Sequence, residues 1–261
     1  MNIKRSTIAL PLLLTLSLCA CAAKPSAPTS APPEEMEEPT PSVILQETED
    51  AGQAYLDRFV FFGESTTYHL KSRGVLSGGT ETRQVWGPDN GTANLDATIT
   101  TIRIRYPETG EYLTVGEAAA RKRPDYLVLT FGLNGAPQKR KRGKDAYLSV
   151  YRKLIDELQA ASPQTQIVLQ SCFPVAANMD MTHYSMTLDE LNDTIRLINQ
   201  WTLSLAEEYG LPYLNTAEIL TDEDGRLKSA YQNGDGYHLT REAYVEILAY
   251  IRTHRVEEVR P

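Results

Sequence analysis

The segment Phe59-Val60-Phe61-Phe62-Gly63-Glu64-Ser65 is the strongest indication of fold in this chain, because it joins an apolar run to a glycine and a serine. Four large apolar side chains in a row, without polar alternation, are typical of a strand buried on both faces of a parallel sheet. The glycine allows a sharp turn, and a serine directly after such a turn can begin a helix. We therefore expect a strand, a turn and a helix here, with the Ser65 hydroxyl at the helix N-terminus, where N–H groups favour an anion.

Further strands are indicated by short apolar runs downstream. Residues 126–131 and 167–170 have the same composition and end abruptly, and residues 212–214 form a weaker fourth run. Residues 74–116 are less regular, and we expect two strands there, at 83–86 and 98–105. A hairpin turn is expected at Glu108-Thr109-Gly110, which follows the second of these strands.

Helical patterns lie between the apolar runs. Residues 146–161 and 241–252 are helical by pattern, with the apolar residues of the first on one helix face. Thr187-Leu188-Asp189-Glu190 matches a capping box, which opens a helix that Gly210 ends. Alternating strands and helices predict an α/β fold, a three-layer α/β/α sandwich with a central, mostly parallel sheet.

The N-terminus has the pattern of an export signal. Lys4 and Arg5 precede an apolar run over residues 8–18, which is too short to span a membrane comfortably. The run ends in Leu18-Cys19-Ala20-Cys21, which resembles a bacterial lipobox with Cys21 as the lipidated residue. We expect a signal peptide at residues 1–20 and an extracytoplasmic protein anchored to the cell membrane as a lipoprotein. The alternative is an ordinary secretory signal cut near Ala22 or Ala23.

Composition bounds the rest of the chain. Residues 21–51 are rich in Pro, Ser, Thr, Ala and Glu, which predicts a disordered tether between the lipidated N-terminus and a domain at residues 52–261. The 261 residues carry a net charge of -8, and half of it lies in residues 1–50, where seven acidic residues face three basic ones. The domain is therefore only mildly acidic, and its overall charge does not indicate a nucleic-acid partner. Cys172 is expected to be a buried, inert thiol.

Three short polar motifs follow the expected strands or precede the last helix. Ser65 follows the first strand, Asn134 in Gly132-Leu133-Asn134-Gly135 follows the second, and Asp235 lies three residues before His238. A serine at a helix start and an Asn-Gly turn each have an ordinary structural interpretation. In a tight turn, however, the Asp235 carboxylate can reach the His238 imidazole and fix its tautomer.

Together, in this order, these motifs resemble the SGNH/GDSL hydrolase family. The family's Gly-Asp-Ser block corresponds to Gly63-Glu64-Ser65, its Gly-x-Asn-Asp block to residues 132–135, and its Asp-x-x-His-Leu block to residues 235–239. Glu64 and Gly135 depart from the family pattern, each where the family has Asp, at positions that serve loop architecture. The family's glycine block is assigned to Gly91, with Gly87 or Gly79 as alternatives.

The resemblance implies a flavodoxin-like SGNH-hydrolase fold and a serine mechanism that requires no metal or cofactor. Ser65 is then the nucleophile, His238 the base and acid, and Asp235 the residue that orients the histidine. The implied oxyanion hole consists of the Ser65 and Gly91 N–H groups and the Asn134 side chain.

The expected activity is hydrolysis of carboxylic esters, with O-acetyl groups on envelope or extracellular carbohydrate as the expected substrate. Two alternatives remain open: an O-acyltransferase on the same fold, and a catalytically weak polysaccharide-binding lipoprotein. The basic run Lys139-Arg140-Lys141-Arg142, followed by Lys144, has two interpretations. It lies either at the pocket rim, where it attracts an anionic polymer, or in a solvated loop that contacts water or lipid headgroups.

Overall fold

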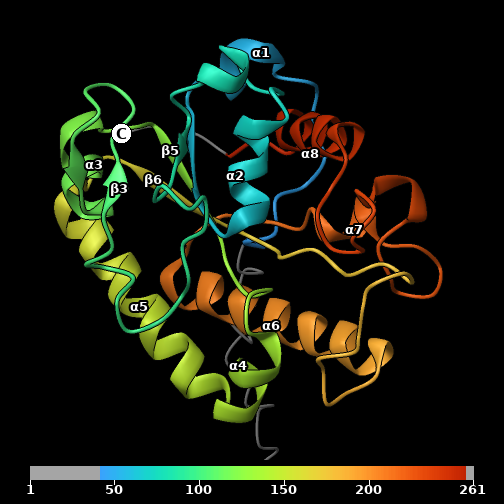
Figure 1. The fold of residues 1–261 in the computed structure, drawn as a ribbon. Coiled ribbons are helices and arrows are strands. Elements are labelled where there is room, and N and C mark those ends of the chain that lie inside the picture. The colour runs from blue at the N-terminus through green and yellow to red at the C-terminus, as the bar shows by residue number, and fades with distance from the viewer. Residues whose placement is uncertain (1–41, 257–261) are drawn as a thin grey trace, which may run out of the picture. The chain divides into compact units, whose positions relative to one another are not determined.

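The computed structural model describes residues 42–256, in which strands and helices alternate along the chain (Figure 1). The strands are β1 (Phe59–Gly63), β2 (Val85–Trp86), β3 (Ile104–Arg105), β4 (Tyr112–Leu113), β5 (Tyr126–Thr130), β6 (Gln166–Gln170) and β7 (Tyr213–Leu214). The helices are α1 (Gly52–Leu56), α2 (Ser65–Ser72), η1 (Gly79–Glu81), α3 (Val115–Lys122), α4 (Ala136–Arg142), α5 (Lys144–Ala161), α6 (Leu188–Tyr209), α7 (Ala217–Leu220), η2 (Ser229–Tyr231) and α8 (Arg241–Thr253).

Five strands form one sheet in the order β2-β1-β5-β6-β7, and every neighbouring pair is parallel. Numbered within the sheet this is the order 2-1-3-4-5, the doubly wound arrangement of flavodoxin-like folds. β3 and β4 form a separate antiparallel pair. The predicted mostly parallel sheet is therefore confirmed.

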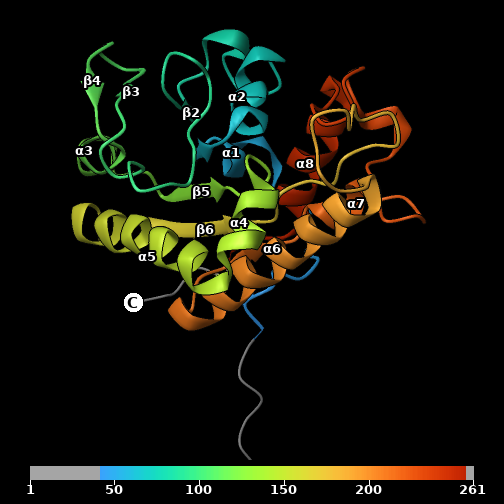
Figure 2. The ribbon, with the colours of Figure 1, turned by 60° about the horizontal axis from the view of Figure 1, so that its bottom comes forward.

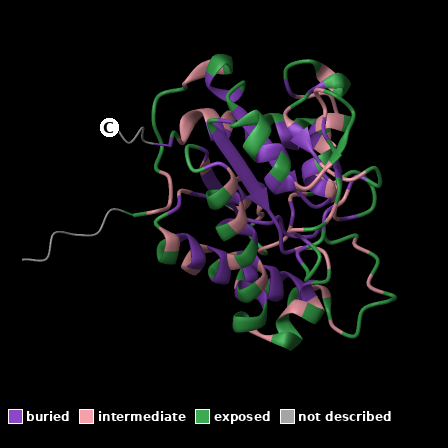
Figure 3. Ribbon diagram, turned by 90° about the vertical axis from the view of Figure 1, so that its left-hand side faces the viewer, coloured by how far each residue is buried: buried purple, intermediate pink, exposed green. Residues whose placement is uncertain are grey.

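Helices cover both faces of the sheet because the strands are apolar on both faces. Val60 and Phe62 of β1 pack in the core shared with α3, α5 and α6, whereas Phe59 and Phe61 pack in the core shared with α1, α2 and α8. Figure 2 shows α5 and α6 on one side of β5 and β6, with α2 and α8 on the other. The burial colouring of Figure 3 shows the same: the central strand is buried, and exposed residues lie on the outer helix faces. The structure is the three-layer sandwich that the sequence predicts.

The predicted helices are confirmed with small shifts at their ends. Helix α5 begins two residues earlier than expected, and α8 ends one residue later. Thr187 and Glu190 form the complete capping box at the start of α6, and Gly210 ends this helix with a φ of 62°. Local capping chemistry thus fixes the longest helix at both ends.

The irregular region between η1 and α3 differs from the prediction. Only Ile104 and Arg105 of the expected strand 98–105 pair, because the Asp96 carboxylate accepts the Thr98 N–H and hydroxyl and holds residues 96–102 in turns. The expected strand at 83–86 is reduced to Val85–Trp86. The hairpin turn is confirmed, since the Tyr106 N–H donates to the Glu111 carbonyl across it.

The domain begins earlier than the predicted boundary after residue 51, so that boundary is wrong. The Tyr213 N–H donates to the Val43 carbonyl, and the Leu45 N–H donates to the Tyr213 carbonyl, which adds the chain around Ile44 beside β7. The three consecutive aliphatic residues Val43, Ile44 and Leu45 are enough for this pairing. The polar composition around them predicts a disordered segment instead. The predicted signal peptide and Cys21 lie outside the described residues. Within residues 42–256, no helix has the length and apolar character needed to cross a membrane.

Candidate active site

The candidate site lies where β1 and β5 end side by side. These two central strands pair from Phe59 with Tyr126 to Gly63 with Thr130, so their carboxyl ends meet at the same edge. In a doubly wound sheet this is the switch point, where the chain leaves the sheet in opposite directions and leaves a crevice. Residues that directly follow β1 and β5 are therefore brought together.

The turn after β1 depends on Gly63. A β-carbon at this position would lie 2.4 Å from the Thr130 carbonyl oxygen and 2.4 Å from the Thr67 hydroxyl, so no larger residue fits. Helix α2 then begins at Ser65, as expected. The Tyr244 hydroxyl of α8 donates to the Thr66 carbonyl at 2.6 Å, which ties the first turn of α2 to the last helix.

Ser65, His238 and Asp235 form a connected triad. The Ser65 Oγ lies 3.1 Å from the His238 Nε2, and the His238 Nδ1 lies 2.7 Å from the Asp235 Oδ2. Both distances are within hydrogen-bond reach, and the Asp235 carboxylate selects the tautomer in which Nδ1 carries the proton and Nε2 accepts. The arrangement can therefore deprotonate the serine hydroxyl.

Asp235 also organises its own loop. Its Oδ1 accepts the N–H groups of Tyr237 at 3.0 Å and His238 at 2.8 Å. Burial alone would raise the pKa of Asp235, but these bonds and the bond from the imidazole lower it below its usual value. Gly236 makes the close approach possible, because its φ is 85° and a β-carbon would lie 2.5 Å from the Met179 Cα. The carboxylate is thus ionised and fixed in place.

His69 is a neighbour of the triad that sequence reasoning did not place there. Its ring centroid lies 4.4 Å from that of His238, and its Nδ1 is buried with no hydrogen-bond partner in the described part of the chain. Burial, followed by the nearby His238 and Arg73, lowers the pKa of His69 to about 4. His69 is therefore neutral at neutral pH. Its position four residues after Ser65 on α2 is the signal that could have identified it.

Glu64 holds the loop that carries Asn134. Its carboxylate is almost completely buried and accepts three consecutive N–H groups, from Gly132 at 3.1 Å, Leu133 at 3.0 Å and Asn134 at 2.9 Å. Burial raises the pKa of Glu64, while Lys139 and the three N–H groups act in the opposite direction. The replacement of the family's Asp by Glu thus preserves an architectural role.

Asn134 lies at the end of the site that faces the loop after β2. Its side-chain amide donates to the Thr92 hydroxyl at 3.0 Å and to the Asn94 side-chain oxygen at 3.1 Å. Gly91 is on the same loop, but its N–H donates to the Pro88 carbonyl at 2.8 Å within a turn. The oxyanion roles of Asn134 and Gly91 stay predictions, and each requires that these donors turn from their present acceptors toward a substrate.

The basic run forms part of helix α4, and its first two members serve the fold. Lys139 contacts the Asn134 carbonyl oxygen, and its Nζ lies 3.9 Å from the Glu64 carboxylate, with 14% of its side chain exposed. Arg140 donates to the Thr194 hydroxyl of α6 at 2.9 Å. These two cations are therefore engaged by the protein, while Lys141 and Arg142 are exposed.

Two further histidines and the buried cysteine have surroundings of other kinds. His183 is exposed in the loop before α6, and His254 stacks on Tyr250 with ring centroids 3.6 Å apart. Cys172 is buried and contacts Asn199, and burial raises the pKa of its thiol, which confirms the expected inert cysteine.

The sequence profile of the GDSL-like lipase/acylhydrolase family matches residues 61–245, which include all three triad residues. The chain belongs to this family. It is thus a GDSL-type acylhydrolase by descent, and the match extends from β1 to α8. Comparison with curated proteins finds no match.

Several solved structures are similar to this family member. One from Streptococcus pneumonia, provisionally described as a platelet activating factor, has a TM-score of 0.52 at 19% identity, covering 74% of this chain and 81% of its own. A GDSL-like lipase from Bacteroides thetaiotaomicron has a TM-score of 0.49 at 16% identity, with 76% and 87% covered. A catalytic mutant of an acetylxylan esterase from Geobacillus stearothermophilus has a TM-score of 0.43 at 18% identity, with 78% and 96% covered. The first of these supports the fold alone.

Proposed function

We propose that the protein is an extracytoplasmic serine esterase that removes small acyl groups, O-acetyl groups first, from envelope or extracellular carbohydrate. The observation that carries the ester chemistry is the continuous chain of contacts from Ser65 through His238 to Asp235. The carbohydrate substrate and the location rest on the lipobox-like Leu18-Cys19-Ala20-Cys21 and the Pro-rich segment after it. An esterase tethered outside the membrane would have envelope polysaccharide within its reach.

The proposed reaction has two halves. In the first half, the His238 Nε2 takes the Ser65 proton while Oγ attacks the ester carbonyl, and the imidazolium then protonates the leaving alcohol. In the second half, His238 activates a water molecule, which releases the carboxylic acid and restores Ser65. Asp235 stabilises the imidazolium in both halves, because its own pKa is held low. The charge on the carbonyl oxygen is greatest between these steps, where the Asn134 amide is proposed to act.

Replacing the nucleophile tests this proposal. In the full chain, Ser65→Ala should reduce hydrolysis of an acetyl ester to the residual level of the oxyanion site, a loss of about 10⁶-fold. The folded state should persist, because the change removes one partly exposed hydroxyl. Ser72→Ala, on the same helix, is the matched control and should retain full turnover. Near wild-type activity of Ser65→Ala would refute the triad assignment.

Product analysis separates the esterase from its alternatives. Hydrolysis releases free acetate from an acetylated glycan, whereas an acyltransferase moves the acetyl group to an added sugar acceptor and releases little acetate. A polysaccharide-binding lipoprotein would bind the glycan without either product. Acetate release that is independent of the acceptor concentration is the expected result.

The lipid anchor is tested at the two adjacent cysteines. Mass spectrometry of the N-terminal peptide from the membrane fraction should find a lipid-modified Cys21. Cys21→Ala should release the protein from the membrane, and the control Cys19→Ala should not. An unmodified terminus at Ala22 or Ala23 would show an ordinary secreted protein instead.

A further inference from the structure

A pocket of about 320 Å³ lies between the loop that carries Asn134 and the loop that carries Tyr237 and His238. Leu133, Val175, Met179 and Leu191 contribute apolar wall, and Tyr184 and Tyr237 contribute aromatic surface. Since one water molecule occupies about 30 Å³ of liquid, the volume equals roughly ten waters. An acetyl group fills only a small part of this volume, which is instead on the scale of one sugar ring.

The pocket adjoins the triad through Tyr237, and the leaving alcohol of the ester must lie close to His238. His238 returns its proton to that alcohol, so the alcohol half of the ester has to lie against the imidazole. Tyr237 lines the pocket, and its ring centroid is 3.9 Å from that of His238. A group bound in the pocket therefore lies against the Tyr237 ring, which itself packs against the ring that delivers the proton.

All the residues that line the pocket are uncharged. The nearest basic side chain of α4, Lys139, is directed to Glu64 and to the Asn134 carbonyl rather than into the pocket. An anionic group bound here would lose its hydration without gaining a cation, which is costly. A neutral ligand is favoured by this lining.

Two tyrosines give the pocket a surface suited to a sugar ring. Tyr184 is 36% exposed at the mouth, and it is close enough to Tyr237 to contribute to that residue's raised pKa, after burial and Asp235. A tyrosine presents an apolar ring face and a polar hydroxyl tip. A pyranose has the complementary surface, with apolar C–H faces and a rim of hydroxyl groups.

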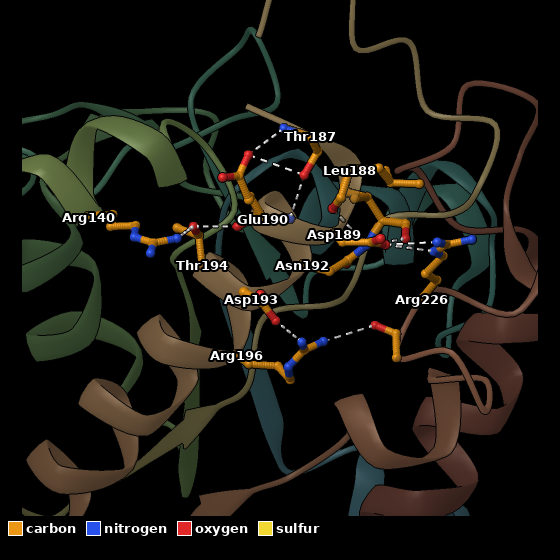
Figure 4. Close-up of polar contacts among 12 residues, drawn as sticks. Arg140, Thr187, Leu188, Asp189, Glu190, Asn192, Asp193, Thr194, Arg196 and Arg226 are labelled. Atoms are coloured by element: carbon orange, nitrogen blue, oxygen red, sulfur yellow. Dashed lines mark hydrogen bonds and ion pairs between the residues drawn. The ribbon is translucent and has the colours of Figure 1, made fainter. Parts of the chain in front are cut away.

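The part of the pocket wall that Leu191 and Val175 form is held in place by contacts within the protein, before any ligand binds. Figure 4 shows the first turns of α6, where Thr187 and Glu190 cap the helix and Arg226 pairs with Asp189 at 2.8 Å. The Asn192 side chain accepts the Val175 N–H at 2.9 Å and donates to the Val175 carbonyl at 3.1 Å, which joins α6 to the segment that carries Val175. Leu191 is therefore fixed relative to Val175, and little ordering is required on binding.

We propose that this pocket binds the neutral pyranose ring that carries the ester, with Tyr184 and Tyr237 as its stacking surface. The inference rests on the proposed esterase function and names the alcohol half of its substrate. The basic residues 139–142 of α4 have no part in recognising that ring. Tyr184 is the residue to test, because it lies at the mouth and outside the triad.

The test compares three acetyl esters on the full chain: a mono-O-acetyl methyl glucoside, the corresponding glucuronide, which is anionic at neutral pH, and ethyl acetate. Wild type should prefer the glucoside over the glucuronide by about tenfold or more in kcat/KM. Tyr184→Ala should lower kcat/KM for the glucoside by about tenfold, chiefly through KM, and leave ethyl acetate within about twofold. Tyr184→Phe keeps the ring and should retain most of the glucoside activity.

The failures are distinguishable. Equal losses on the glucoside and ethyl acetate, or no loss on either, would overturn the pocket assignment while the esterase stands. Ethyl hexanoate is assayed in addition with wild type and Tyr184→Ala, and a loss in the variant on this ester alone would show that the pocket holds an acyl chain. A preference of wild type for the glucuronide would overturn the neutral ligand. Wild-type activity on ethyl acetate with none on either sugar ester would instead overturn the carbohydrate function on which the inference rests.

Discussion

The loop that carries His238 and the loop that carries Asn134 are both held by one carboxylate that accepts consecutive backbone N–H groups. Asp235 accepts N–H groups two and three residues further along its own loop. Glu64 reaches instead to a loop 68 to 70 residues away in the sequence. The same chemistry is therefore local in one half of the site and long-range in the other.

The two carboxylates also differ in what they leave free. The Asp235 side chain is 40% exposed, and one of its oxygens is available to hold the imidazole. The Glu64 side chain is 2% exposed, and both of its oxygens are used by backbone N–H groups, with Lys139 nearby. The contrast indicates that Asp235 acts on the reaction through His238, whereas Glu64 acts on the shape of the loop.

Among changes to the two loops, removing the charge of Asp235 should have the largest effect. Asp235→Asn keeps the size of the side chain but no longer stabilises the imidazolium, and it favours the wrong tautomer of His238. We expect kcat to fall by about 10⁴-fold, with a small change in the thermal midpoint, because the residue is partly exposed. Steady-state kinetics and thermal unfolding of the same preparation check this. A large fall in the midpoint would mean that Asp235, like Glu64, is chiefly architectural.

The oxyanion donor should come next. Asn134→Ala should lower kcat by about 10²-fold to 10³-fold and leave KM nearly unchanged, because the donor acts on charge present mainly in the transition state. Thr92→Val is the matched control: it removes one acceptor of the Asn134 amide but leaves the amide in place. We expect this control to cost far less in kcat. A lower thermal midpoint with unchanged kcat in Asn134→Ala would make the residue a turn former only.

The local half of the site is the half that the sequence predicts well. The spacing of Asp235 and His238 and the turn at Gly63 are properties of a few adjacent residues, as are the buried strands and the capping box at Thr187. The reach of Glu64 to residues 132–134 is set by the pairing of β1 with β5, so no short window contains it. The edge contact of Ile44 gives too little periodicity to be recognised, and the two paired residues of β2 give too little to fix the bounds of that strand.

Glu64 provides the third prediction, in which rate and stability should change together. Glu64→Gln places an amide N–H₂ among buried N–H donors, so at least one donor loses its acceptor. Such a loss costs about 1 to 3 kcal/mol of the free energy of unfolding, and we expect kcat to fall by roughly tenfold as Asn134 loosens. Urea unfolding and steady-state kinetics measure the two effects.

The matched variant is Glu64→Asp, which restores the family's residue and keeps the charge. It should lose less stability than Glu64→Gln, although the shorter side chain cannot reach all three N–H groups equally. If Glu64→Gln instead lost 10⁴-fold in kcat at full stability, the distinction between the two carboxylates would disappear.

His69 and His238, whose rings are neighbours in space, differ in a similar way and with the smallest expected effect. His238 has a carboxylate partner, and His69 has none among the described residues. The pKa of His69 is lowered to about 4 by burial, His238 and Arg73, against the opposing influence of Asp235, while the unfolded chain titrates near 6.5. Between these values the unfolded state binds a proton that the folded state does not bind. The contribution of neutral His69 to the free energy of unfolding is therefore fully present above pH 6.5 and is lost as the pH falls toward 4. From pH 7.5 to 5.0, His69 should account for at most about 2 kcal/mol of that loss, because solvent screens part of the effect at this half-buried ring.

His69→Phe keeps a ring against His238 but cannot bind a proton, so its free energy of unfolding should fall by up to about 2 kcal/mol less than that of wild type over this range. Urea unfolding at the two pH values measures the difference, and His183→Phe, at an exposed histidine, should follow wild type. Parallel curves for wild type and His69→Phe would mean that folded His69 binds a proton as readily as the unfolded chain does, so that below about pH 6.5 a cation would lie beside His238 and oppose formation of the imidazolium. A neutral His69 leaves Asp235 as the charge that His238 meets when it takes the Ser65 proton. The triad can then work near neutral pH although two histidine rings lie 4.4 Å apart.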